Sequence, residues 1–101
     1  MIMVEEIAFI EVQEGKQDAF EEAVRIASKD IFPRSQGFVS LSLGRGIERP
    51  NTFALKIKWD SVEDHTIGFV QSELFGAWSV LVTDLLGEAP IVEHWRPVDL
   101  V

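Results

Sequence analysis

Two histidines, His65 and His94, are the side chains of this 101-residue chain best suited to acid–base chemistry. Histidine titrates near neutral pH, so a histidine at a pocket edge could take a proton from a phenol or an activated C–H group. We predict His65 as the catalytic base; the alternative is that it packs within a helix and bonds a backbone group near Trp59. Strand alternation places His94 on the face of Val92 and Arg96, pointing either into a pocket or toward a second subunit.

Aromatic side chains could complete a pocket for a flat ligand, because such pockets are mostly apolar with few polar groups. Arg45, between Gly44 and Gly46, could anchor a carboxylate or phenolate, although an arginine in such a loop is more often solvated. The alternative for the aromatic residues is a place in the hydrophobic core, since their spacing also suits core positions. The predicted substrate-binding residues are Trp59, Phe69, Phe75, Trp78, His94 and Arg45.

Motifs for metals and cofactors are missing from the sequence. A metal site at His65 and His94 would need a third ligand from Asp or Glu, and no His-x-His or His-x-x-x-His spacing occurs. The Gly44-Arg45-Gly46 loop lacks the third glycine of a dinucleotide fingerprint and does not open a helix. Neither a Walker loop nor a Ser-x-x-Lys or Gly-x-Ser-x-Gly nucleophile motif is present. We therefore predict no metal and no cofactor.

The charge balance excludes several partners. Nine basic and seventeen acidic residues give a formal charge of −8, which would repel phosphate backbones and anionic membrane surfaces. The chain has no cysteine, so it can form neither disulfides nor a thiolate metal site. The first residues lack the basic and apolar regions of a signal peptide, and no apolar run approaches the roughly 18 residues of a membrane span. We expect a cytoplasmic protein that binds neither nucleic acid nor membrane.

Hydrophobic periodicity predicts the order strand, helix, strand, strand, helix, strand. Pro33 should end the first helix, and Gly87 the second. In the second strand, Val39, Leu41 and Leu43 are expected to share one face. The predicted strands are 3–12, 38–43, 52–59 and 91–98, and the predicted helices are 16–29 and a second helical region in two parts, 62–70 and 72–86.

This order is that of an α+β, ferredoxin-like domain with a four-stranded antiparallel sheet and both helices on one face. A single domain over residues 1–101 fits the length. The first strand is apolar on both of its faces, so the sheet face without helices also needs cover. A second copy of the chain is the simplest cover, and we therefore predict a homodimer that packs sheet on sheet as a dimeric α/β barrel.

Two stretches resemble a known family. Residues 53–65, FALKIKWDSVEDH, look like the strand, tryptophan and Ser-x-x-x-His run of antibiotic biosynthesis monooxygenase domains. Residues 69–78, FVQSELFGAW, and the closing strand with 92–95, VEHW, resemble the same domains. The resemblance implies a dimeric α/β barrel with a pocket between helices and sheet. It also implies relatives that oxidise polyketide aromatics with molecular oxygen and no cofactor, degrade haem, or act as isomerases.

The chain departs from the catalytic sets of those relatives. The place of the haem-ligating histidine is taken by Trp78-Ser79-Val80, so haem degradation is not predicted. The quinone-forming members use Asn, Trp and Tyr, whereas this chain has no tyrosine and its only asparagine is Asn51 in a loop. We predict a cofactor-independent monooxygenase acting on a small aromatic or polyketide-like substrate in an apolar pocket. The alternatives are a non-catalytic dimeric small-molecule-binding or stress-related module and an isomerase of the same superfamily.

Overall fold

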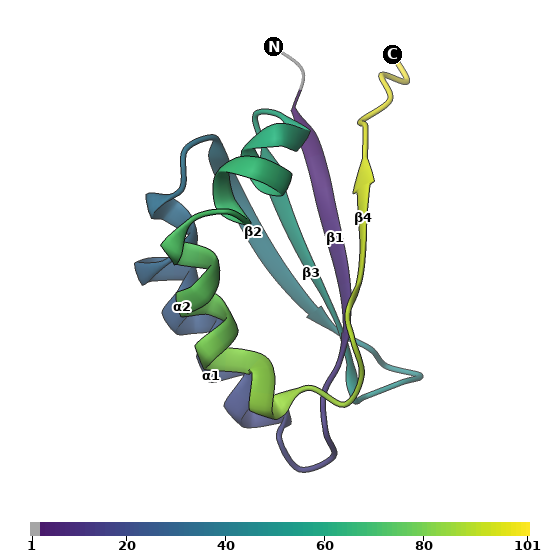
Figure 1. The fold of residues 1–101 in the computed structure, drawn as a ribbon. Coiled ribbons are helices and arrows are strands. Elements are labelled where there is room, and N and C mark those ends of the chain that lie inside the picture. Colours follow the sequence, from purple (N-terminus) through teal and green to yellow (C-terminus); the bar gives the residue numbers. More distant parts are fainter. Residues whose placement is uncertain (1–2) are drawn as a thin grey trace.

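A four-stranded antiparallel sheet organises the computed structural model, which describes residues 3–101 (Figure 1). The strands lie in the order β2-β3-β1-β4, so the first and third strands are central and the last strand forms an edge. This is the predicted ferredoxin-like α+β arrangement. The strands are β1 (Val4–Glu11), β2 (Phe38–Arg45), β3 (Thr52–Trp59) and β4 (Ile91–Trp95).

The helices lie on one face of the sheet (Figure 1). Helix α1 turns its four buried side chains, Phe20, Ala23, Val24 and Ala27, toward the sheet at the spacing of an amphipathic helix. Pro33 lies in the 3₁₀ turn Phe32–Arg34 that follows α1, because proline fits the first turn of a helix but not its interior. The helical segments are α1 (Gln17–Asp30), η1 (Phe32–Arg34), η2 (Asp64–Phe69), α2 (Glu73–Val82) and η3 (Thr83–Leu85).

The core lies between the helices and the facing side of β1 and β3. Ala8 pairs with Leu55 and Ile10 pairs with Phe53 across the two strands, and all four side chains are buried. Trp59, at the end of β3, is fully buried. Successive inward residues of two adjacent strands therefore form the floor on which the helices rest.

The predicted face of β2 is wrong at Val39. The pairing of β2 with β3 shifts between Phe38 and Ser40, which inserts one extra residue into β2. Such a bulge reverses the alternation on its far side. Val39 is therefore 42% exposed, while Leu41 and Leu43 pack against the core.

The second helical region and the last strand end earlier than predicted. A π-helical turn, η2, precedes α2, and the Oγ of Ser72 caps α2 by accepting a hydrogen bond from the Leu74 N–H. Helix α2 ends at Val82, and the 3₁₀ turn η3 replaces its last predicted turn. Strand β4 ends at Trp95 rather than at residue 98, because its partner Glu5 lies one residue from the start of β1.

The other face of the sheet carries no helix (Figure 1). Phe9 on β1 and its partner Ile91 on β4 are 37% and 62% exposed, and Trp95 is 53% exposed. Among the described residues, no helix is long and apolar enough to cross a membrane. The face without helices therefore presents apolar side chains that the protomer itself leaves uncovered.

Candidate active site

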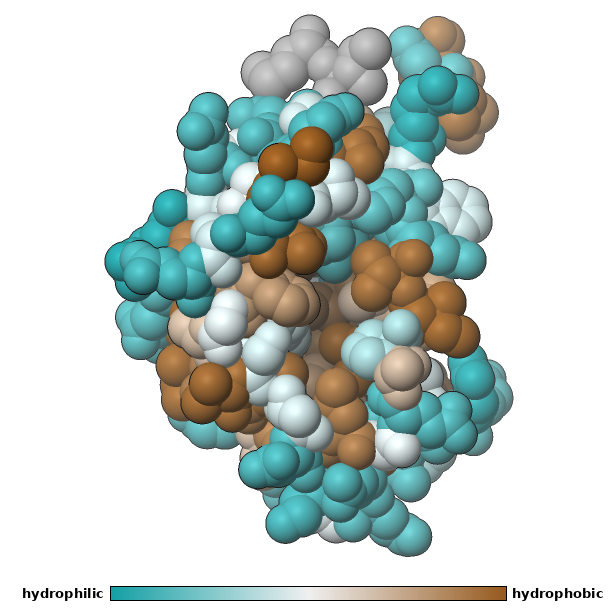
Figure 2. Space-filling model, in the orientation of Figure 1, coloured by the Kyte–Doolittle hydropathy of each residue, from teal (hydrophilic) through white to brown (hydrophobic). Residues whose placement is uncertain are grey.

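A cavity of about 290 Å³ lies between α2 and the sheet. Figure 2 shows a recess on this face of the molecule, between α2 and β4, bordered largely by hydrophobic residues. Its volume is near the lower end of the roughly 300–1,000 Å³ range of small-molecule sites. The cavity can therefore hold a flat ligand of up to about three fused rings, but not a large cofactor.

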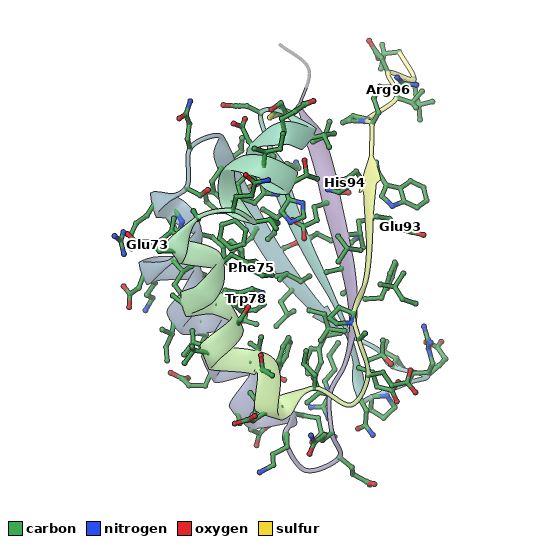
Figure 3. The ribbon with its side chains drawn as sticks, in the orientation of Figure 1. Glu73, Phe75, Trp78, Glu93, His94 and Arg96 are labelled. Atoms are coloured by element: carbon green, nitrogen blue, oxygen red, sulfur yellow. The ribbon has the colours of Figure 1, made fainter. Side chains whose placement is uncertain are left out.

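Aromatic and aliphatic side chains make most of the cavity wall. Phe75 and Trp78 extend from α2 toward the sheet (Figure 3). Phe69 and Phe32 stack with ring centroids 5.0 Å apart and close the wall behind them. The remaining wall residues are Ile10, Leu55, Ser79, Val82, Thr83, Leu86, Pro90 and Val92.

Glu6 and His65 make the wall polar at one end. Glu6 lies on the core-facing side of β1 and is only 6% exposed. His65, in the π-helical turn η2, is 8% exposed, and its Nε2 lies 3.4 Å from Oε1 of Glu6. π-Helical turns are rare and are frequently found at functional sites. A carboxyl group and an imidazole thus meet at the edge of an apolar cavity.

His94 continues this polar chain toward the surface. On β4 it pairs with Glu6 across the sheet and lies on the same face, while its neighbour Glu93 points away (Figure 3). Nε2 of His94 lies 2.8 Å from Nδ1 of His65, a hydrogen bond in which one imidazole donates and the other accepts. His94 is exposed, so it connects the buried pair with solvent.

Trp59 contacts both Glu6 and His65 and does not line the cavity. Its indole Nε1 donates a hydrogen bond of 2.9 Å to Oε1 of Glu6, reaching diagonally from β3 to β1. The indole ring also stacks on the imidazole of His65, with centroids 5.5 Å apart. Trp59 therefore fixes the orientation of both groups, and a ligand in the cavity would meet Phe69, Phe75 and Trp78 instead.

Burial raises the pKa of Glu6 and lowers the pKa of His65. Burial raises the pKa of the Glu6 carboxyl to about 7, although the hydrogen bond from Trp59 acts in the lowering direction. Burial, together with the nearby His94, lowers the pKa of His65 to about 4. At neutral pH His65 is therefore neutral, and Glu6 is divided between its protonated and ionised forms. Such a carboxyl can both take and return a proton at this pH.

Arg45 lies away from this site. Its Nε donates a 2.8 Å hydrogen bond to the carbonyl of Pro50, and its guanidinium lies 3.7 Å from Glu21 and 5.7 Å above the ring of Phe53. Strand β2, which ends at Arg45, is the edge opposite to β4, so the position of the residue in the sheet separates it from the cavity. Arg45 therefore cannot contact a ligand in this cavity.

Glu6 is the ionisable residue of the site that the sequence analysis does not predict. The apolar parity of β1 runs through Val4, Ala8, Ile10 and Val12, and Glu6 occupies the same parity. An acidic residue in a core-facing stripe is rare unless it is paired, so this position was a usable signal. Within residues 3–101, no group of three or more His, Asp or Glu residues is arranged to hold a metal ion.

Comparison with known proteins identifies relatives of this chain. The family model for antibiotic biosynthesis monooxygenase matches residues 3–80. An uncharacterised protein of Bacillus subtilis, YczJ, is 33% identical over 96 residues, which cover 95% of this chain and all of the relative.

Solved structures share the fold. A protein of Bordetella bronchiseptica with the provisional name of an antibiotic biosynthesis monooxygenase superposes with a TM-score of 0.93 at 36% identity, covering 97% of this chain and 99% of its own. A similarly named protein of Nitrosomonas europaea gives a TM-score of 0.82 at 20% identity, covering 95% and 90% of the two chains. The second likeness concerns the fold alone.

Proposed function

The chain belongs to the antibiotic biosynthesis monooxygenase family, and on that premise we propose that it is a cofactor-independent monooxygenase of small aromatic substrates. The observation that carries the proposal is the pair of Glu6 and His65 at the polar end of an otherwise apolar cavity. The apolar wall would hold a flat ring and exclude water. The acid–base pair would remove a proton from the substrate, and this removal would make the ring electron-rich enough to react with oxygen.

The proposed reaction needs no group other than substrate, oxygen and a base. For a ring carbon bearing two hydrogens, as in anthrone, a carbonyl replaces the two hydrogens, and one oxygen atom of O₂ leaves as water. The substrate loses four electrons and O₂ gains four, so no external reductant is consumed. The protein would supply proton transfer and a cavity of suitable shape, with His65 as a catalytic residue and Phe69, Phe75 and Trp78 as substrate contacts.

Oxygen uptake tests this function. Purified protein is incubated in air-saturated buffer with a panel of dihydroxynaphthalenes and anthrones, and oxygen is followed with an electrode. We expect uptake with at least one compound, formation of the corresponding quinone, and a rate about 100-fold or more lower in His65→Ala, the usual range for loss of an acid–base group. Absence of uptake across the panel, or an undiminished rate in His65→Ala, would contradict the proposal.

A binding module without turnover is the second candidate, and one observation favours it. The chain has no tyrosine, and Asn51 lies outside the cavity, where its side chain accepts a hydrogen bond from Gln17. Native mass spectrometry showing a retained ligand, with no product after incubation in air, would support this candidate. Proton exchange on a substrate carbon without oxygen uptake would instead indicate an isomerase.

We also propose that the active form is a homodimer. The sheet face without helices exposes Phe9, Ile91 and Trp95, and a second copy placed on it by two-fold symmetry would bury them. Light scattering should return twice the protomer mass, and Phe9→Glu should shift the sample toward the monomer. A protomer mass at micromolar concentration would contradict this assembly.

A further inference from the structure

Glu6 is an acidic side chain where the strand pattern calls for an apolar one. It sits in the buried stripe of β1, between Val4 and Ala8, and is 6% exposed. A buried carboxyl destabilises the fold unless its oxygens are partnered. Oε1 has two neighbours, the Trp59 N–H at 2.9 Å and His65 Nε2 at 3.4 Å. Among residues 3–101 the structure shows no hydrogen bond to Oε2, which leaves this oxygen free to meet a ligand.

We propose that Glu6 is a further catalytic residue, which takes a proton from the ligand in the cavity and returns it to the oxygen that leaves as water, while His65 and His94 connect it to solvent. This inference rests on the proposed oxygenase function for its second half. The first half, removal of a proton from a bound ring, does not depend on oxygen. The two halves can therefore be tested separately.

The proton and electron balance of the proposed step closes. Glu6 takes one proton from the substrate C–H group, and the resulting carbanion gives one electron to O₂. The two radicals combine into a C–O bond, and Glu6 returns its proton to the terminal peroxide oxygen. Glu6 then takes the second C–H proton as the O–O bond breaks and returns it to the departing hydroxide. The products are a ring carbonyl and water, and the carboxylate is regenerated.

The hydrogen bonds of His65 and His94 can take two arrangements, one for each protonation state of the Glu6 carboxyl. When Glu6 is ionised, His65 carries its proton on Nε2, facing Glu6, and His94 donates from Nε2 to Nδ1 of His65. When Glu6 is protonated, the pattern reverses, so that His65 carries its proton on Nδ1 and donates it to His94. Changing from one pattern to the other moves one proton between Glu6 and the exposed end of His94. The 3.4 Å contact is longer than a hydrogen bond, as catalytic contacts often are before substrate binds.

The groups around Glu6 favour this role over that of a fixed ion. From η2 it meets His65, from β4 it meets His94, and from β3 it meets the uncharged N–H of Trp59. The residues that α2 and η3 add to the wall, including Ser79 and Thr83, are not titratable. No permanently charged cation thus faces the carboxyl from these elements, and burial raises its pKa to about 7. Its protonation then changes near neutral pH, where a general base is most effective.

Deuterium exchange without oxygen tests the first half directly. Anthrone is incubated with the protein in deuterated buffer under nitrogen, and loss of the ring CH₂ proton signal is followed by NMR. We expect the wild type to accelerate exchange with a pH midpoint near 7, and Glu6→Gln to lose about 100-fold or more of that rate. Gln keeps the shape and the acceptor for Trp59 but cannot take a proton. Glu11→Gln, on the same strand and exposed, is the matched control and should behave as wild type.

Exchange that survives in Glu6→Gln at the wild-type rate would overturn the inference. If exchange depends on Glu6 but no panel compound consumes oxygen, the proposed oxygenase function fails and the role of Glu6 as a base stands. A second measurement needs no substrate. Infrared spectroscopy of the ligand-free protein should show one carboxyl band that titrates near neutral pH and is missing in Glu6→Gln. Absence of such a band would also overturn the inference.

His94 is a positioning residue in this scheme and needs its own readout. His94→Leu removes the hydrogen bond to Nδ1 of His65, so we expect the pH midpoint of exchange to move while the fold is kept. His94→Gln retains a side-chain donor and should restore the wild-type midpoint. A His94→Leu variant that loses stability but keeps the wild-type midpoint would show that His94 is merely structural.

Discussion

Helices α1 and α2 pack against the same sheet to different extents. Helix α1 buries four side chains, and Phe20 packs against Phe53 with ring centroids 4.9 Å apart. Helix α2 buries only Val82, and its aromatic residues, Phe75 and Trp78, border the cavity. The part of the core beneath α1 is filled, whereas the part beneath α2 is hollow. Stability is therefore concentrated under one helix, and space for a ligand under the other.

This division also separates the ionisable groups. The filled part is lined by hydrophobic residues, while Glu6 and His65 lie at the edge of the hollow part. Burying a carboxyl group destabilises a fold, and strongly shifted pKa values cluster at functional sites. The comparison thus teaches where to look for function in this fold: under the helix that packs less completely.

Removal of one phenylalanine from each part should give the largest difference. Phe20→Ala should lower the free energy of unfolding by about 3–5 kcal/mol, because it opens a void in a close-packed region. Phe75 is 38% exposed and borders the cavity, so Phe75→Ala should lower it by about 1 kcal/mol and weaken ligand binding instead. Urea denaturation of the two variants measures both values. Equal losses would show that the two parts are packed alike.

The pH dependence of stability should isolate the site. Unfolded Glu6 ionises at 4.5 and folded Glu6 at about 7, so this group makes the folded state less stable as pH rises through that window. His65 has a pKa of 6.5 unfolded and about 4 folded, so it makes the folded state more stable as pH rises from 4 to 6.5. In the wild type the two slopes oppose each other.

In Glu6→Gln, the pH dependence of stability should keep the contribution of His65 and lose that of Glu6. In His65→Gln, it should keep the contribution of Glu6 and lose that of His65. In Glu6→Gln, stability should rise by about 3 kcal/mol or less between pH 4 and 6.5 relative to wild type. In His65→Gln, it should fall by a similar amount between pH 4.5 and 7. Denaturation midpoints at several pH values give both curves. Parallel curves for the wild type and both variants would rule out the shifted acidities.

Filling the hollow part should separate binding from stability. Ser79 lines the cavity from α2, so Ser79→Leu should abolish ligand binding while changing the free energy of unfolding by about 1 kcal/mol or less. Ala77→Leu, on the exposed side of the same helix, adds a bulky side chain outside the cavity and should bind normally. Calorimetric titration with a dihydroxynaphthalene compares them. Normal binding by Ser79→Leu would place the ligand elsewhere.

The cap of α2 should have the smallest of these effects. Ser72→Ala removes the side-chain acceptor for the Leu74 N–H and should cost about 1 kcal/mol of stability. Ser72→Gly should cost only a few tenths relative to serine, because glycine is itself tolerated at this position. Thermal denaturation ranks the pair, and an alanine variant as stable as wild type would show that α2 does not depend on its cap.

The order and type of the elements could be predicted because periodicity reports burial directly. The buried stripe of α1 and the inward residues of β3 lie where their spacing places them. Val39 could not be placed correctly, because the bulge beside it is set by the pairing of β2 with β3 rather than by the residue itself. The same holds for the early end of β4, which depends on where β1 begins.

The candidate site could be predicted in part. His65 and His94 were singled out as residue types able to move protons, but their mutual contact depends on bringing η2 beside the edge strand. Arg45 has suitable chemistry, yet the strand order places it at the opposite edge of the sheet. Glu6 combines a sequence signal, an acid in an apolar stripe, with a partner, Trp59, that only the sheet register reveals.

Three indole N–H groups allow the central claim to be tested in one spectrum. Trp78 lines the cavity, Trp59 is bonded to Glu6, and Trp95 lies on the face without helices. In a ¹H–¹⁵N titration with a dihydroxynaphthalene, ligand in the cavity should shift the indole signals of Trp78 and Trp59 and leave that of Trp95 in place. A shift of Trp95 alone, or no shift of Trp78 at saturating ligand, would contradict a ligand site beneath α2.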